Sequence, residues 1–277
     1  LEVRHGGALH RLDAERVLLA AGALSSPRLL LASADAAHPE GLANGSGQVG
    51  RNLMFHFNEL FALWPPRGTP PGPATKEVSL RDLYHQPGVR LGTIQSMGLR
   101  AGYGEITHFL GLMARRSALR RLPGLGLLTR LAAAASVRLF GGAQIFVGLL
   151  EDLPYPGNRV TLDPAAPDRI CVTYEFAPEL LARRRTFRRA ILKRLRGLRR
   201  VLLTPLPEPN FGHACGTLRM GHDPATSVVR ADCRAHELQN LWVADASFMP
   251  TSMGVNPSLT IAANALRVAD SITKESA

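Results

Sequence analysis

Two polar side chains in glycine-rich surroundings have the chemistry to accept a proton and to stabilise a negative oxygen. His213 stands in the segment FGHACGTLRMG, and Asn256 stands in MGVNPSLT. A neutral imidazole can accept a proton near neutral pH, and an amide N–H can donate a hydrogen bond to an oxygen on which charge develops. The residues alone favour plainer roles, a hydrogen-bonded loop histidine and a helix cap, so the surrounding elements have to be considered.

The sequence around Asn256 predicts a ligand-binding edge of an α/β sheet. The apolar run Leu241–Asp245 predicts a buried strand, and residues 246–255 predict a turn. Asn256 and Pro257 are placed as the cap and first residue of a final helix that ends near Lys274. Ligands of open α/β sheets bind beyond the carboxyl ends of the strands, and a helix N-terminus there favours an anionic group such as a pyrophosphate.

The same order of strand, turn and helix is predicted near the start of the chain. The strand is Arg16–Ala20, and the helix covers Arg28–Ser33 with Ser25 or Ser26 as its cap. The turn between them consists of three small residues, Ala21, Gly22 and Ala23. Before this step, residues 1–4 and 9–12 flank two glycines and predict a β-hairpin.

The middle of the chain predicts a second sheet and further helices. Short apolar runs within residues 89–112 and 143–150 predict strands of that sheet. Residues 160–162 and 170–176 predict paired strands joined by a turn rich in Pro and Asp. Residues 115–139 are helical in pattern on both sides of a Pro-Gly break.

Positive charge is the dominant feature of the composition. The 277 residues carry a formal net charge of +11, and almost all of the cations are arginine. The segment Pro178–Arg200 predicts a strongly basic helix with one apolar stripe, which is typical of a solvated helix and could instead face an anionic membrane or a partner. No aromatic platform or recognised motif accompanies the arginines, so we expect no nucleic-acid partner.

Several functional classes lack their usual motifs. There is no P-loop, H-E-x-x-H or G-x-S-x-G, and the three cysteines form no C-x-x-C pair, so neither a metal site nor a disulfide framework is expected. The glycine pattern at residues 45–50 does not follow a buried strand, and we do not interpret it as a dinucleotide loop. No apolar run approaches the ~18 residues of a membrane span, and a cytoplasmic location is the default expectation.

Three stretches of the sequence resemble the glucose–methanol–choline (GMC) oxidoreductases. They are Gly22–Ser33 (GALSSPRLLLAS), Gly47–His56 (GQVGRNLMFH) and His213–Asp270, of which the last is the most specific. Tyr155–Phe176 is weakly similar to the region that precedes it. The first stretch departs from the family pattern after Ser33, where Ala34-Asp35-Ala36 stands in place of the usual glycine.

The resemblance implies an α/β plus α+β fold. One part is a Rossmann-like FAD-binding domain, and the other is a substrate-binding domain built on an antiparallel sheet. Carried onto this chain, residues 1–33 are the late part of the FAD-binding domain, residues 34–205 the substrate-binding (cap) domain, and residues 206–277 the return to the FAD-binding domain.

The resemblance also implies the chemistry and its residues. GMC proteins oxidise a small-molecule alcohol to a carbonyl compound by transferring a hydride to FAD. His213 matches the active-site histidine, which would accept the hydroxyl proton, and Asn256 matches a position that is Asn or His across the family. The residues that match segments near the cofactor are Asp245, Ala246, Pro257 and Ser258, together with Ala21, Gly22 and Ala23.

Some questions stay open at the level of sequence. Because the family's glycine-rich FAD loop would precede Leu1, we expect an upstream region, and we expect this chain alone to bind FAD weakly or not at all. The alternative is a non-catalytic or split-enzyme fragment that binds a partner chain or an anionic surface through its basic helix. The alcohol and the electron acceptor, whether oxygen, a quinone or a cytochrome, are not predicted. His56 and His222 are interpreted as structural and Cys215 as a packing residue.

Overall fold

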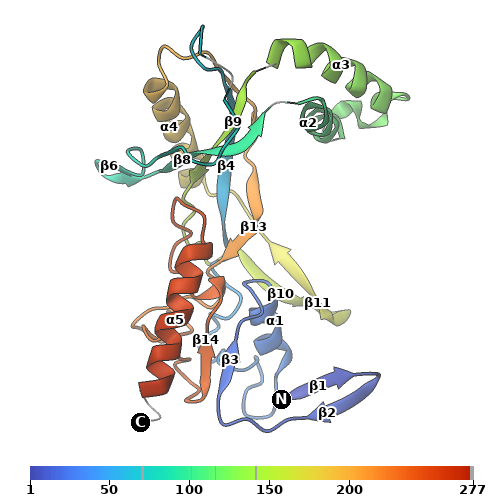
Figure 1. Ribbon diagram of the computed structural model, residues 1–277. Helices are drawn as coiled ribbons and strands as arrows, with labels where there is room; N and C mark the ends of the chain where they lie inside the picture. Colours follow the sequence, from blue (N-terminus) through green and yellow to red (C-terminus); the bar gives the residue numbers. More distant parts are fainter. Residues whose placement is uncertain (70–71, 101, 116, 141, 275–277) are drawn as a thin grey trace. The chain divides into compact units, whose positions relative to one another are not determined.

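The computed structural model of the chain describes residues 1–69, 72–100, 102–115, 117–140 and 142–274 (Figure 1). The chain divides into two units, each assembled from separate stretches of sequence. The first unit consists of Leu1–His56, Glu151–Leu181 and Pro209–Ala277. The second unit consists of Phe57–Leu150 and Ala182–Glu208.

These boundaries differ from the ones expected from the sequence. Residues 34–56 and 151–181, which were expected in the substrate-binding domain, belong to the first unit. The reason is their packing: Val49 lies in the same buried core as Trp242, and Val160 packs with Leu53. Two segments that look like connections in the sequence therefore contribute to the core of the first unit.

The first unit contains the predicted steps from strand to helix. Strand β3 (Val17–Leu19) and strand β14 (Leu241–Val243) are parallel neighbours, with Leu19 opposite Val243. Helix α1 (Ser25–Ala32) follows β3, and helix α5 (Ser258–Lys274) closes the chain. The expected serine cap of α1 is wrong, because Leu24 occupies the cap position without a side-chain hydrogen bond.

Three further strand pairings complete the first unit. The predicted N-terminal hairpin is confirmed as β1 (Glu2–His5) paired with β2 (Ala8–Arg11). The second predicted pair is confirmed as β10 (Arg159–Asp163) with β11 (Ala166–Thr173). Residues 211–215, the first part of the segment 211–221 that was interpreted as a glycine-rich loop, instead belong to strand β13 (Pro209–Cys215). This strand pairs with β4 (Met54–Leu63), of which Met54–His56 belong to the first unit.

The second unit is built on an antiparallel sheet. Its path runs in the order β12-β4-β9-β8-β5. Besides β4, the sheet contains β5 (Ser79–Leu80), β8 (Gly92–Arg100), β9 (Gln144–Leu150) and β12 (Arg200–Leu202). A separate short hairpin is formed by β6 (His85–Gln86) and β7 (Val89–Arg90).

The prediction of strands within residues 89–112 is confirmed for β8 and is wrong for the second part of that range, which is helical. Helix α2 covers Tyr103–Arg115, followed by a 3-10 turn η1 (Ala118–Arg121) and helix α3 (Leu125–Phe140). The apolar residues Ile106, Phe109 and Leu110 recur at a spacing of three to four, which is the period of a helix and not of a strand. No helix among the described residues is both long and apolar enough to cross a membrane.

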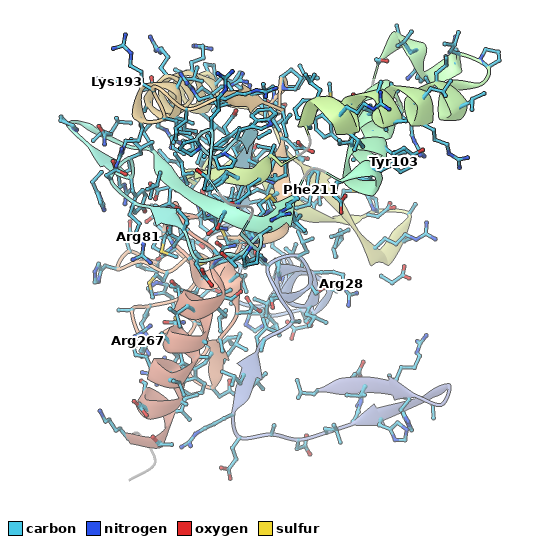
Figure 2. The ribbon with its side chains drawn as sticks, turned by 45° about the horizontal axis from the view of Figure 1, so that its top comes forward. Arg28, Arg81, Tyr103, Lys193, Phe211 and Arg267 are labelled. Atoms are coloured by element: carbon cyan, nitrogen blue, oxygen red, sulfur yellow. The ribbon has the colours of Figure 1, made fainter. Side chains whose placement is uncertain are left out.

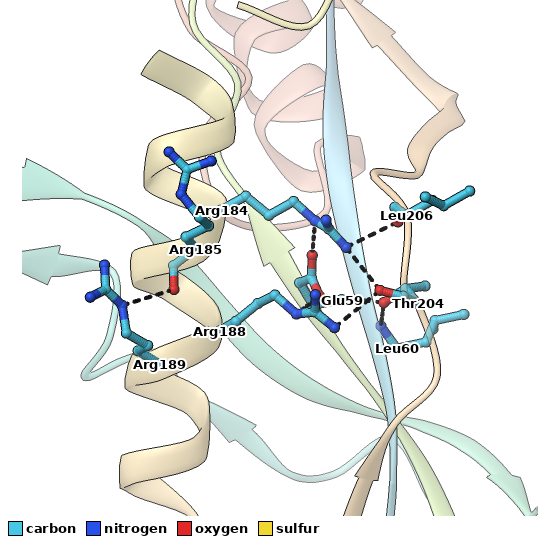
Figure 3. A network of polar contacts seen from close by, with 8 residues as sticks. All are labelled: Glu59, Leu60, Arg184, Arg185, Arg188, Arg189, Thr204 and Leu206. Carbon is cyan, nitrogen blue, oxygen red and sulfur yellow. Dashed lines mark hydrogen bonds and ion pairs between the residues drawn. The ribbon is translucent and has the colours of Figure 1, made fainter. Parts of the chain in front are cut away.

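Helix α4 (Pro178–Arg194) ends earlier than expected and is less solvated than its sequence suggests. Phe187 and Ile191 form the predicted apolar stripe and are fully buried. Two arginines of the same helix turn inward to Glu59 of β4, a carboxylate with no exposed surface (Figure 3). Part of the positive charge of this helix is therefore paired inside the second unit and is not available to a partner.

The contacts of that buried carboxylate are extensive. Arg184 pairs with Glu59 and also donates to the carbonyl oxygens of Thr204 and Leu206, at 2.8 and 3.0 Å. Arg188 Nε lies 3.0 Å from the second carboxylate oxygen. Because one terminal nitrogen of each guanidinium group also donates to the carbonyl oxygen of Thr204, the ion cluster fixes α4 to β4 and to the segment after β12.

Candidate active site

Two histidines of the first unit are in direct contact. Strand β13 carries His213, and the start of strand β4 carries His56. Their Nδ1 atoms lie 3.1 Å apart, and the rings meet edge to face with centroids separated by 4.9 Å. At this distance one of the two nitrogens donates its proton to the other, so the tautomers of the two rings depend on each other.

His56 is fully buried and is held in the neutral form. Burial and, after it, the charge of His213 lower its pKa to about 4, although backbone groups of Met253, Ser252 and Val255 act in the opposite direction. These backbone groups come immediately before Asn256 in the sequence. His56 therefore lies against both β13 and the segment that leads to Asn256.

Asp152 fixes the chain around His56. Its Oδ2 accepts hydrogen bonds from the backbone N–H of Phe55 at 3.1 Å and from the hydroxyl of Tyr174 at 2.5 Å. Its own N–H donates to Ser252 Oγ at 2.7 Å. Burial, and after it the charge of Asp152, raises the pKa of Tyr174, so that the phenol remains a donor. The residue before His56 and the segment before Asn256 are thus tied to one buried carboxylate.

His213 is partly exposed and suited to accept a proton. Burial lowers its pKa below the usual 6.5, which keeps it neutral at neutral pH. If Nδ1–H of His213 donates to His56, the Nε2 lone pair is left free to accept a proton. Asn210 Nδ2 lies 3.2 Å from the same Nδ1 and donates to it in the other tautomer. His56 and Asn210 therefore favour opposite tautomers of His213.

The final helix begins one residue later than predicted, so Asn256 precedes the cap position. Helix α5 begins at Ser258, and the carbonyl of Pro257 accepts the first helical hydrogen bond, from Ile261 N–H at 2.9 Å. Pro257 is thus the cap residue, and the interpretation of Asn256 as a helix cap is wrong. The Asn256 side chain is exposed and makes no hydrogen bond within the described part of the chain.

The other predicted residues form a hydrogen-bonded cluster where β3 and β14 end. Asp245 is buried; it accepts hydrogen bonds from Gly22 N–H at 2.9 Å and from Ser247 N–H at 2.8 Å, and it is also bound by the hydroxyl of Ser26. Gly22 has a φ of +86°, and a Cβ added there would meet no atom within 4 Å. The hydrogen bond from Gly22 to Asp245 therefore joins the turn after β3 to the turn after β14, and the space beside Gly22 is open.

The small residues beside this cluster also support the turns. The carbonyl of Ala23 accepts the hydroxyl of Thr217 at 2.6 Å, and the carbonyl of Ala246 accepts Gly216 N–H at 3.1 Å. Ala21 is exposed. No hydrogen bond among the described residues links the cluster to Pro257 or Ser258.

Cys215, two residues after His213, is enclosed by the core. Its side chain has no exposed surface, its thiol lies 3.7 Å from the carbonyl oxygen of Met54, and burial raises its pKa. Cys233 is also fully buried, whereas Cys171 is exposed. A protonated, enclosed thiol is a weak nucleophile, so Cys215 acts as a packing residue between β13 and β4.

The sequence interpretation missed two residues of this site. His56 was assigned a structural role, although it ends one of the three stretches that carried the family resemblance. Asp152 gave no motif; the only available signal was a carboxylate directly after the apolar run of β9. Both residues are recognised as part of the site only by contacts with distant parts of the sequence, His56 with His213 and Asp152 with Phe55.

Comparison with known proteins gives the family. The family model described as GMC oxidoreductase matches residues 154–265. The chain is 31% identical to 2-methyl-1,2-propanediol dehydrogenase of Mycolicibacterium austroafricanum over 97% of its own length and 49% of the relative's. It is also 31% identical to the fructose dehydrogenase large subunit of Gluconobacter japonicus, over 96% of this chain and 48% of that one.

Solved structures show the same fold. Pyridoxine 4-oxidase from Mesorbium loti aligns with a TM-score of 0.59 at 23% identity, over 98% of this chain and 53% of that chain. A fungal aryl-alcohol oxidase aligns with a TM-score of 0.53 at 20% identity, over 98% of this chain and 56% of that chain. The chain spans about half the length of the curated relatives that it matches. The likeness to these structures shows the fold, and the sequence matches show that the chain belongs to the GMC oxidoreductase family and corresponds to the C-terminal portion of its members.

Proposed function

We propose that the protein is an FAD-dependent oxidoreductase that oxidises a CH–OH group to a carbonyl, with His213 as the base. The observation that carries the proposal is the contact between His213 and the buried, neutral His56, at 3.1 Å between their Nδ1 atoms. An acceptor at the Nδ1 position of His213 leaves Nε2 free for the substrate hydroxyl. The named relatives include dehydrogenases and oxidases of alcohols, which supports the reaction class.

The two site residues have separate tasks. His213 accepts the hydroxyl proton at Nε2 while its Nδ1 proton is held by His56. Asn256 donates an amide hydrogen bond to the oxygen as negative charge develops on it, and its exposed, uncommitted side chain is available for this. FAD, when bound beside these residues, would supply the acceptor for the hydride of the carbinol carbon.

The residues present suit one side of an FAD site. The Asp245 carboxylate accepts hydrogen bonds from Gly22 N–H, Ser26 and Ser247, which stabilise its charge and hold the two turns in place beside the position proposed for the pyrophosphate. Gly22 leaves open space where a side chain would stand. Ala21, Ala23 and Ala246 would line the same edge, and Pro257 and Ser258 at the start of α5 would approach the flavin ring.

The first unit is, in this proposal, part of a Rossmann-like FAD-binding domain. Its parallel pair of strands exposes Leu18 at 53%, and α5 exposes Leu259 at 82% and Leu266 at 70%. Apolar side chains this exposed need cover, and the other half of the relatives' length is the natural source of it. FAD would then be held jointly by that half and by the edge described above.

The experiment is anaerobic flavin reduction by the FAD-loaded, full-length protein. Candidate alcohols are taken from the relatives' names: 2-methyl-1,2-propanediol, fructose and paromamine. We expect bleaching of the oxidised flavin spectrum with at least one of them, and a reduction rate lowered by ~10²–10⁴-fold in His213→Ala with the flavin still bound. A variant that retains the normal rate at every pH would refute the base assignment.

The electron acceptor is measured in the same preparation. Since the relatives include both oxidases and dehydrogenases, the reduced protein is mixed with oxygen, a quinone and a cytochrome in turn. The acceptor that restores the oxidised spectrum fastest identifies the class.

A further inference from the structure

Helix α3 exposes an apolar face to solvent. Leu127, Leu128, Leu131 and Leu139 are between 49% and 63% exposed. At 100° per residue these four leucines lie within about 120° of one another around the helix. Ala133, on the other side, is fully buried. The outward side of α3 is therefore the more apolar one, the reverse of an ordinary surface helix.

The elements before α3 extend this surface. Leu112 of α2, Leu119 of η1 and Leu122 are also exposed. Figure 2 shows α2 and α3 with their side chains, with Tyr103 labelled at the start of α2. We call the exposed leucines of α2, η1 and α3 the leucine face.

Different side chains connect these helices to the sheet of the second unit. Ile106, Phe109 and Phe140 face a cavity of about 350 Å³, whose other walls include Leu60 and Ile145 of the sheet. Of the leucine face, only Leu112 also lines this cavity; the exposed leucines of η1 and α3 are not among its walls. The leucine face has no cover within the described second unit, and an apolar surface of this extent usually marks a binding site.

Positive charge dominates the segment that carries the leucine face, although α2 has one carboxylate, Glu105, in its first turn. The sequence contains no Asp or Glu from Ile106 to Phe140. The described arginines in that stretch, all exposed, are Arg115, Arg120, Arg121, Arg130 and Arg138. An apolar stripe bordered by cations is the pattern of helices that lie in the interface of an anionic bilayer. A second copy of this chain is a poor occupant, because it would bring two sets of arginines together.

We propose that α2, η1 and α3 dock the protein on an anionic lipid bilayer. The leucine face enters the boundary between headgroups and acyl chains, and the arginines contact the phosphates. The surface lies in the second unit, away in sequence from His213 and Asn256, so this docking does not depend on the proposed function. It also differs from the basic helix α4, where Arg184 and Arg188 are occupied by Glu59.

The test is co-sedimentation of the full chain with vesicles of phosphatidylcholine alone or with about 30% phosphatidylglycerol. We expect binding to the anionic vesicles that weakens as salt is raised. Arg120→Glu with Arg121→Glu should lower the affinity by about 30-fold or more. The charge-matched control is Arg185→Glu with Arg189→Glu on the exposed side of α4, which should leave the affinity within about threefold of the wild-type value.

The leucines are tested separately from the charges. Leu127→Ser with Leu131→Ser should lower the affinity by about 100-fold at unchanged net charge. Leu131→Trp reports insertion directly, since its fluorescence should be quenched by lipids brominated on the acyl chains, whereas Trp64 and Trp242 are buried in the protein.

Three outcomes overturn the proposal. The first is equal binding to neutral and anionic vesicles, or none to either. The second is an equal loss in the α4 control, which would show that net charge alone drives binding. The third is a lipid-free dimer that the serine variant dissociates, which would show that a second copy covers the leucine face.

Discussion

Acidification should destabilise this protein through one histidine, His56. The ring is fully buried, and its pKa is lowered from 6.5 to about 4, chiefly by burial. In the unfolded chain it titrates near 6.5, so between these two pH values the unfolded state binds a proton that the native state does not. The stabilisation is therefore complete above pH 6.5 and is lost as the pH falls toward 4.

The magnitude follows from the two pKa values. The difference between 6.5 and about 4 corresponds to about 3.4 kcal/mol when both states are protonated. At pH 4.5 the expected loss relative to pH 7 is about 2.5 kcal/mol. This is a large share of the roughly 5–15 kcal/mol by which native proteins are stable.

The assay is urea unfolding of the full chain at pH 7.0 and pH 4.5. Carboxylates also contribute to acid destabilisation, so the change in the free energy of unfolding between the two pH values is compared in wild type and His56→Asn. Asparagine keeps a polar atom near the Nδ1 position but does not titrate in this range. We expect the free energy of unfolding of the variant to fall about 2.5 kcal/mol less than that of wild type. The matched control is His5→Asn on the exposed N-terminal hairpin, which should retain the wild-type pH dependence.

An equal pH dependence in wild type and His56→Asn would refute this reasoning. It would mean that His56 is hydrated or protonated in the native state. A protonated His56 would donate to His213 at Nδ1 instead of accepting from it. The tautomer argument for the base would fail together with it.

Three other predictions concern single residues. Asn210→Asp replaces the amide at 3.2 Å from His213 with a carboxylate; it should raise the pKa of His213 and move the acid limb of the kcat/KM profile to higher pH, and an unmoved limb would remove Asn210 from the site. Glu59→Gln should lower the free energy of unfolding by about 3–5 kcal/mol, because it leaves the buried Arg184 and the partly exposed Arg188 without their counter-charge. Asp82→Asn in an exposed ion pair should cost at most about 1 kcal/mol, and similar losses from both variants would contradict the burial argument. Asn256→Ala should slow flavin reduction by ~10²–10³-fold with little effect on Tm, and an effect on KM alone would limit Asn256 to substrate positioning.

The elements that were predicted correctly are those whose signal is local. The parallel strands Val17–Leu19 and Leu241–Val243 are short apolar runs between turns, and the hairpin of residues 159–173 has its turn residues in place. Strands were expected within residues 89–112, and the part that forms α2 was included because its apolar content was considered without its period. Most of strand β13 was mistaken for a loop because of Gly212 and the glycines that follow the strand, although pairing with β4 outweighs the weak strand propensity of glycine.

The candidate site was predicted only in part, and for the same reason. His213 and Asn256 came from family resemblance, since neither residue type nor spacing distinguished them from a loop histidine and a helix cap. His56 is separated from His213 by 157 positions, so nothing near either residue in the sequence reveals the contact. Asp152 is also informative only through Phe55, Tyr174 and Ser252, which lie far from it along the chain.

The three cysteines differ in their exposure to solvent, so their reactivity with a thiol reagent reports local unfolding of the first unit. Cys171 on β11 meets solvent, while Cys215 and Cys233 are sealed in the first unit. An alkylating reagent should therefore label one thiol at once and the other two only when that unit opens. A mass spectrum taken at successive reaction times gives the number of labelled thiols without a reporter group. The rate at which Cys215 is labelled then measures how often β13, the strand that carries His213, separates from β4.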